Sequence, residues 1–253
     1  MKQSEKNKLE YEGKILPSNN CGDFKVLEYR STNDVLIEFI NTGTKISVWL
    51  GNIKKGTIKD PYYPSVYNIG YIGEGEFKSK IDGVQPTYYK RWKEMISRCY
   101  NVKDKEYSCY GGIGVRVCDE WLNFQNYAKW WIENCPDESF SLDKDILEKG
   151  NKLYSPDKCC FVPKEINSSL TFRKSYRGDL PLGVSRKGNK FVAQAHNKDS
   201  TVYLGLFDTP EEAFNIYKQY KKTRIEEYAN KYKEILDSKV YNALMNFELE
   251  ITD

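Results

Sequence analysis

Few residue types in this chain of 253 residues are suited to catalysis or metal binding, and their spacing further limits the kinds of site that they could form. The single histidine, His196, excludes any site that needs two histidines as ligands or as acid–base groups. The seven cysteines contain no C-x-x-C pair, so a zinc ribbon or a thioredoxin-like redox site has little support. Asp143 and Asp145 would share one face of a strand and could form a paired-carboxylate site. The same Asp-x-Asp spacing is also common in loops.

The composition bounds the class of protein. Lysine and arginine (39) nearly balance aspartate and glutamate (36), and the apolar fraction of 40% is enough to build hydrophobic cores. A disordered polyelectrolyte and a histone-like cation are therefore excluded. No apolar run approaches the roughly 20 residues of a membrane span, and the charged N-terminus has no secretory signal. We expect a cytoplasmic protein with reduced cysteines, no membrane association and no small-molecule cofactor.

The strands and helices expected from the sequence, which must position these residues, indicate an α+β fold in several parts. Strand-length runs in the first part (24–30, 35–40 and 44–50) indicate a small sheet, whereas the polar residues 1–20 are expected to fray. Amphipathic helices are expected over 88–101 and 120–135. The expected parts are a small β module (1–60), a linker (61–87), a central domain with flanking helices (88–175), a sheet-and-helix domain (180–236) and a tail (237–253).

The sheet-and-helix domain has the clearest local signals. Three short strands, LPLGVSRKG, KFVAQAHN and TVYLGLFD, are separated by turns at 187–189 and 197–199. Thr209 then suits an N-cap, Pro210 the first helical position, and Glu212 the third position of a capping box. We therefore expect a three-stranded sheet that packs on one long helix ending near Tyr232.

Residues 182–224 resemble the AP2-type DNA-binding domain. The resemblance rests on Gly183-Val184, on Lys190–Ala193, on Leu204–Thr209 and on Glu211–Ala213. It implies that the three-stranded sheet enters the major groove of double-stranded DNA.

Strand alternation selects the residues that would face the DNA. In the strand 190–196, one face is expected to carry Lys190, Val192, Gln194 and His196, and the other face Phe191, Ala193 and Ala195. A glutamine amide can pair with adenine through two hydrogen bonds, so Gln194 is the candidate for base reading. The alternative is a small module with ordinary solvated charges. The candidate DNA-binding residues are Arg186, Lys187, Lys190, Gln194, His196 and Tyr203.

A second resemblance covers residues 141–170, SLDKDILEKGNKLYSPDKCCFVPKEINSSL. This stretch resembles the core of the HNH, or ββα-metal, nuclease superfamily, and residues 110–121 resemble the stretch that precedes the core in viral members from phages. A core of this kind joined to an AP2-like domain is similar to phage endonucleases. The resemblance implies that Asp143, at the end of the second hairpin strand, and Asn167, on the following helix, hold Mg²⁺ or another divalent cation. Oxygen ligands of this kind suit Mg²⁺.

The chain departs from that family at its general base. The usual histidine after the Asp143 position is Lys144 here, which the resemblance assigns to holding the phosphate. Tyr110 or Tyr107 would then serve as the base, although an unperturbed tyrosine, with a pKa near 10, is a poor base at neutral pH.

Three functions remain open at this point. The first is a sequence-specific, Mg²⁺-dependent double-stranded DNA endonuclease, a hydrolase that acts as a monomer. The second is a catalytically degenerate DNA-binding regulator or counter-defence protein that keeps the nuclease fold. The third is a protein-interaction adaptor without nucleic acid, supported only by the balanced charge. Basic side chains on the helix 88–101, including Arg98, are expected to form a solvated face that extends a phosphate track in a DNA enzyme.

Overall fold

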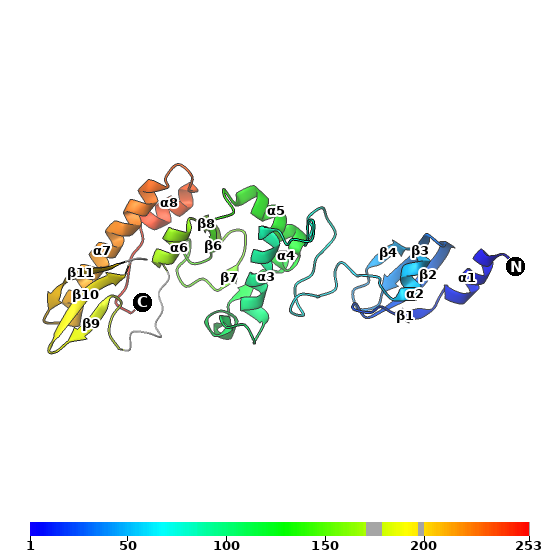
Figure 1. Cartoon of the computed structure of the whole chain (residues 1–253), viewed down its shortest axis with the longest axis horizontal. Helices are drawn as coiled ribbons and strands as arrows, with labels where there is room; N and C mark the ends of the chain where they lie inside the picture. The colour runs from blue at the N-terminus through cyan, green and yellow to red at the C-terminus, as the bar shows by residue number, and fades with distance from the viewer. Residues whose placement is uncertain (171–178, 197–199, 253) are drawn as a thin grey trace. The chain divides into compact units, whose positions relative to one another are not determined.

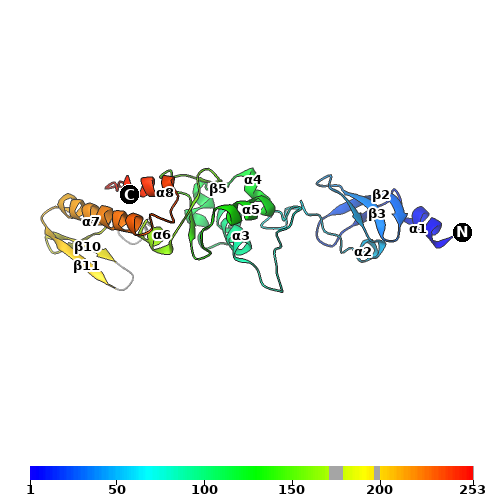
Figure 2. The same cartoon turned by 90° about the horizontal axis from the view of Figure 1, so that it is seen from above.

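The computed structural model describes residues 1–170, 179–196 and 200–252, so the predicted turn at 197–199 lies outside the described residues. The chain has an α+β fold of helices and several small sheets, as expected (Figure 1; Figure 2). It divides into two compact units, one of residues 1–133 with 152–155 and one of residues 134–151 with 156–253. The residues expected to form one central domain contribute to both units. No helix in the described ranges is long and apolar enough to cross a membrane.

The first unit begins with a four-stranded antiparallel sheet in the order β1-β2-β3-β4. Alternate residues of β2 and β3 are fully buried, including Phe24, Val26, Ile37 and Phe39, because one face of the sheet forms the core of the module. The predicted strands are all present. Their bounds, with those of two helices, are α1 (Gln3–Tyr11), β1 (Ile15–Pro17), β2 (Asp23–Ser31), β3 (Asp34–Phe39), β4 (Lys45–Val48) and α2 (Leu50–Lys55).

The expectation that residues 1–20 fray is wrong, because residues 3–11 form helix α1. Two long-range hydrogen bonds attach this segment to the sheet. The buried Asn7 amide donates to the hydroxyl of Tyr29 at 3.1 Å, and the Glu12 carboxylate accepts the backbone N–H of Tyr29 at 3.0 Å. One strand residue therefore anchors both the helix and its C-terminal end.

An aromatic core follows in the same unit. Trp92, Trp121, Phe124 and Tyr127 are fully buried, and the Trp92 indole donates to the Trp121 carbonyl at 2.7 Å. The two predicted helices are present, although the second is divided at Asn123. The elements are α3 (Thr87–Tyr100), the short 3₁₀ helices η1 (Tyr107–Cys109) and η2 (Gly111–Ile113), β5 (Arg116–Val117), α4 (Asp119–Leu122) and α5 (Phe124–Asn134). β5 pairs in parallel with β7 (Leu153–Tyr154).

The segment expected as a linker is fixed to these helices by the buried side chain of Gln125. Its amide nitrogen donates to the carbonyls of Ile72 and Phe77, and its amide oxygen accepts the N–H of Phe77. Tyr71 adds two backbone hydrogen bonds, to Leu122 and from Phe124. Although it is rich in glycine, this segment is therefore held to the helices by hydrogen bonds.

The second unit contains a β-hairpin followed by a helix. β6 (Ser141–Asp143) pairs with β8 (Cys160–Val162), and α6 (Lys164–Leu170) follows. Asp143 therefore ends the first strand of this hairpin, not the second, because the apolar run after Lys158 forms a further strand before the helix.

The three predicted strands and the long helix of the C-terminal part are present. β9 (Val184–Lys187), β10 (Lys190–His196) and β11 (Thr201–Phe207) form a sheet in the order β11-β10-β9, and α7 (Pro210–Lys231) lies along it (Figure 1; Figure 2). Close packing requires a glycine at Gly183, where φ is +74° and an added Cβ would lie 2.1 Å from the Tyr217 ring. The buried residues between sheet and helix include Phe191, Ala193, Ala195, Ala213, Phe214 and Tyr217.

Residues 237–253, expected as a tail, pack onto this part where the structure describes them. Helix α8 (Ser238–Met245) contacts α7, and Leu249 is only 2% exposed within the sheet–helix core. The Glu248 carboxylate pairs with Lys218 at 3.1 Å and with Lys222 at 2.9 Å. The C-terminal segment therefore completes the core of the second unit.

The capping box of α7 gives a direct stability test. The Thr209 hydroxyl accepts the Glu212 N–H at 3.2 Å, and the Glu212 carboxylate accepts the Thr209 N–H at 3.3 Å. Thr209→Ala removes the first bond, and we expect it to lower the free energy of unfolding by about 1 kcal/mol. Urea unfolding followed by circular dichroism measures the change. Thr209→Ser keeps the hydroxyl and should be close to wild type; equal midpoints for all three proteins would contradict the role of the cap.

Candidate functional site

Asp143 lies at the end of β6, opposite Cys160 of β8. Its Oδ1 atom accepts the backbone N–H groups of Asp145 at 2.7 Å and Ile146 at 2.9 Å. Burial raises the pKa of the Asp143 carboxyl, and the two backbone hydrogen bonds oppose that shift. The carboxyl group is therefore oriented by the start of the following loop.

Lys144 is buried, with 8% of its surface exposed, and its ammonium points into that loop. The ammonium donates to both carboxylate oxygens of Asp145 at 2.8 Å and to the carbonyl of Asn151 at 2.6 Å. The Asn151 amide returns a hydrogen bond to the Lys144 carbonyl at 2.9 Å. These bonds close residues 144–151 into a loop around one cation. Contact of Lys144 with a phosphate, which stays a prediction, would require some of them to break.

Asn167 is half-buried on α6, and α6 packs against β6, the strand that ends in Asp143. The structure thus brings the two elements that carry the predicted metal ligands together in one unit. Within the described ranges, no three or more histidine, cysteine, aspartate or glutamate side chains form a metal-binding group. One carboxylate and one amide oxygen nevertheless suit Mg²⁺, which keeps several waters and needs one or two protein ligands. The donor set therefore fits such an ion.

Tyr110, the predicted base, lies in the first unit between η1 and η2, whereas Asp143, Lys144 and Asn167 lie in the second. The guanidinium of Arg98 lies over the Tyr110 ring, 4.7 Å from its centre. Sequence reasoning missed this contact, because it assigned Arg98 to a solvated helix face. A signal was present: Arg98 is three residues after the buried Met95 and therefore borders the buried stripe of α3.

The face of sheet β9–β11 that points away from α7 carries most of the predicted DNA-binding residues. Lys190, Gln194 and His196 alternate with the buried Phe191, Ala193 and Ala195 and so lie on this open face, which also includes Val192, a residue that is only 7% exposed. Lys187 is directly opposite Lys190, and Tyr203, which is 64% exposed, is opposite Gln194. We call this face, with its five predicted DNA-binding residues, the open face.

A β-bulge decides which residues of β11 belong to the open face. Ala193 pairs with Gly205 and Gln194 pairs with Tyr203, so Leu204 is an extra residue that packs toward the core. Tyr203 and the half-exposed Leu206 therefore share a face although they are three residues apart. Simple alternation would place them on opposite faces.

Arg186 differs from the other candidates. It pairs with Phe191, and its guanidinium lies 5.0 Å from the centre of the Phe191 ring, on the side of the sheet that faces the helix. Lys190 also has a partner, because its ammonium pairs with Asp208 at 2.9 Å at the surface. The His196 ring nitrogen Nδ1 lies 2.9 Å from the Thr201 hydroxyl.

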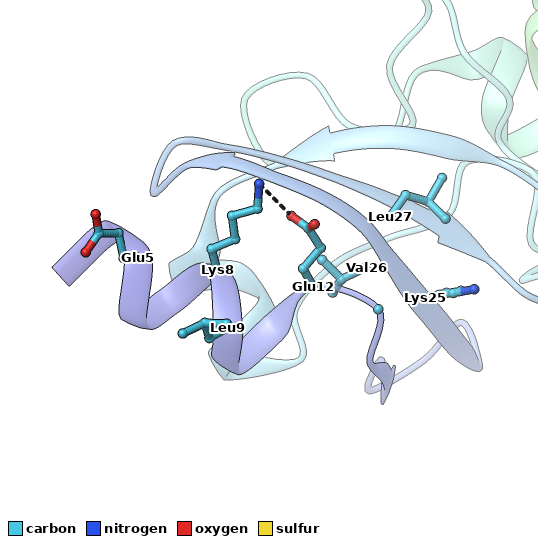
Figure 3. Close-up of a pocket in the computed structure, with 8 residues that line it drawn as sticks. Glu5, Lys8, Leu9, Glu12, Lys25, Val26 and Leu27 are labelled. Atoms are coloured by element: carbon cyan, nitrogen blue, oxygen red, sulfur yellow. Dashed lines mark ion pairs between the residues drawn. The ribbon is translucent and has the colours of Figure 1, made fainter. Parts of the chain in front are cut away.

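The N-terminal module contains a cavity of about 750 Å³ between α1 and β2 (Figure 3). Figure 3 shows two of its lining residues, Lys8 and Glu12, which form an ion pair at 3.8 Å, with the exposed Leu9 below them. A neighbouring carboxylate, Glu5, also lines it. None of the predicted catalytic or DNA-binding residues lines this cavity.

No protein-family model, no curated protein and no solved structure matches the chain. The resemblances to the HNH core and to the AP2-type domain therefore remain predictions that rest on their motifs. What the chain does must be inferred from its residues and their geometry.

The loop around Lys144 gives a second stability test. Lys144→Met keeps the aliphatic stem but leaves the Asn151 carbonyl and Asp145 without their cation, and we expect it to cost about 1–2 kcal/mol of unfolding free energy. Lys158→Met is the matched control, because Lys158 forms only a surface pair with Glu148 and should change stability by less than about 0.5 kcal/mol. Thermal or urea unfolding compares the two. Equal effects would show that the loop does not depend on the buried ammonium.

Proposed function

We propose that the chain is a sequence-specific double-stranded DNA endonuclease of phage type, which binds its target as a monomer in the cytoplasm and cuts it with a divalent cation. The open face of sheet β9–β11 is the observation that carries this proposal. It presents basic, amide and aromatic side chains on one surface while the other surface is buried against α7.

The chemistry of the open face suits a DNA groove. The major groove is wide enough to admit a β-ribbon, and its base edges present donors and acceptors. Lys187 and Lys190 would hold phosphates, and Gln194 would pair with an adenine. Tyr203 and His196 would add contacts at the end of the sheet where β10 finishes. Backbone phosphates would position the sheet, and the base contact would provide the sequence preference.

Cleavage would take place at Asp143 and Asn167, which would hold Mg²⁺. The ion, when bound, would stabilise the negative charge on the leaving oxygen of the phosphodiester. The two backbone N–H groups on Asp143 Oδ1 fix the plane of the carboxyl group, so its second oxygen has a defined direction.

A second candidate function has a specific observation in its favour. The Lys144 ammonium, at the position where the family has its histidine base, is engaged by Asp145 and Asn151 within its own loop. A DNA-binding regulator or counter-defence protein without turnover would tolerate that arrangement. It predicts salt-dependent DNA binding without any metal-dependent product.

Asp143→Asn tests the cleavage site. An asparagine oxygen can still accept the two backbone N–H groups, so the loop should be preserved, whereas the negative charge toward the cation is lost. We expect Mg²⁺-dependent cleavage of plasmid and of phage or host DNA to fall about a hundredfold or more, with binding within a few-fold of wild type.

Glu148→Gln is the matched control for that variant, because it removes a surface carboxylate from the same segment between β6 and β7. Asp143→Ala, which also removes the loop hydrogen bonds, should lose cleavage and some stability. Equal cleavage by wild type and Asp143→Asn would remove Asp143 from the mechanism. Cleavage by wild type should require Mg²⁺ and should be suppressed by EDTA. If wild type binds DNA but gives no such metal-dependent product, the chain is the regulator and not the endonuclease.

The open face is tested by two neighbouring cations on opposite sides of β9. Lys187→Ala should weaken binding to a DNA duplex and reduce the slope of log affinity against log salt by about 1. Arg186→Ala removes the same charge from the helix-facing side and should change the slope less. Fluorescence anisotropy at several salt concentrations gives both slopes. A larger effect of Arg186→Ala would show that the open face is not the DNA surface.

A further inference from the structure

The first unit contains an arginine, Arg98, whose guanidinium contacts two aromatic rings and forms no ion pair with any residue that the structure describes. The Arg98 guanidinium lies between the ring of Tyr110, at 4.7 Å, and that of Tyr154, at 5.8 Å. Its Nε atom is buried and has no hydrogen-bond partner in the described part of the chain. Cation–π contacts stabilise the charge but satisfy none of its N–H donors.

The same arginine lines a cavity of about 500 Å³ beside α3 and the loop that follows it. Three lysines, Lys90, Lys93 and Lys105, line the cavity with it. Among the residues that the structure describes, none of these lysines forms an ion pair. Four cationic side chains therefore line the cavity.

Three carboxylates line the same cavity. Glu94 pairs with Arg91 at 3.0 Å, and Asp104 accepts the Ser97 hydroxyl at 2.5 Å and a backbone N–H of the loop at 2.9 Å. A third carboxylate, Glu106, also lines the cavity. The positive groups still exceed the negative ones, so the cavity favours an anion.

We propose that this cavity binds a backbone phosphate of a DNA strand, with Arg98 as its principal donor. A guanidinium offers two parallel N–H groups to phosphate oxygens, and such charge-assisted bonds are strong where water is partly excluded. Lys90, Lys93 and Lys105 supply the surrounding positive potential. The site extends the proposed DNA contact to the first unit and rests on the proposed function, because it takes its phosphate from the same substrate.

The test measures binding of a labelled DNA duplex to the full chain by fluorescence anisotropy, with EDTA present so that the DNA stays intact. Arg98→Met should weaken binding about tenfold at low salt and reduce the slope of log affinity against log salt by about 1. The double variant Lys93→Met/Lys105→Met changes only the cavity rim and should reduce the slope as well, which keeps the test valid if Arg98→Met folds poorly.

Lys129→Met is the matched control, because Lys129 is an exposed cation on α5 of the same unit that does not line the cavity. It should change the slope less than the cavity variants. Equal slopes for the control and the rim variant would overturn the proposal. Inorganic phosphate provides a separate arm: if it raises the melting temperature of wild type but not of Arg98→Met, while DNA affinity is equal in both, the cavity takes a small phosphate compound and the strand assignment is overturned.

The outcomes separate this site from the proposed function as a whole. Loss of affinity in Lys187→Ala with unchanged affinity in the cavity variants would overturn only the Arg98 site. No salt-dependent retention of any duplex by the wild-type chain would overturn both. Loss in both sets of variants would support two DNA contacts, one in each unit.

Discussion

The packing of one side of β10 against α7 is the constraint on which the rest of the second unit depends. Phe191, Ala193 and Ala195 are buried under the helix, and the side-chain period of a strand is two, so their neighbours in β10 must lie on the opposite face of the sheet. A shift of one residue would bury Lys190 and Gln194 and expose the core. The position of the proposed DNA-binding residues is thus a consequence of core packing, which fixes them more firmly than any contact they make themselves.

Local signals predicted the regular elements well, since strand alternation, the Thr209 capping box and the aromatic stripe of α3 are encoded by neighbouring residues. Features that depend on distant partners could not be predicted. Helix α1 forms because Asn7 and Glu12 reach Tyr29, and polar composition alone indicates fraying there. The bulge at Leu204 changes the face of Tyr203, and no residue spacing within β11 announces it.

For the candidate nuclease site, the sequence predicted which residues to consider but not the interactions that they make. The adjacency of β6 and α6 follows from the hairpin–helix pattern, so Asp143 and Asn167 could be chosen from the motif. The bonds of Lys144 to Asp145 and Asn151 could not, because they depend on how a particular loop closes. Arg98 shows the same limit: its charge suggested solvent, whereas two tyrosine rings, one of them far along the chain, surround it.

Sheet β9–β11 has two edge strands, and neither is suited to pairing with a further strand. β9 is only four residues long and contains Arg186 and Lys187, while β11 is interrupted by its bulge. Short, charged or bulged edges discourage association through backbone hydrogen bonds. Copies of this chain therefore have little tendency to pair through the edges of this sheet. The sheet is instead suited to contact a partner through the side chains on its exposed face.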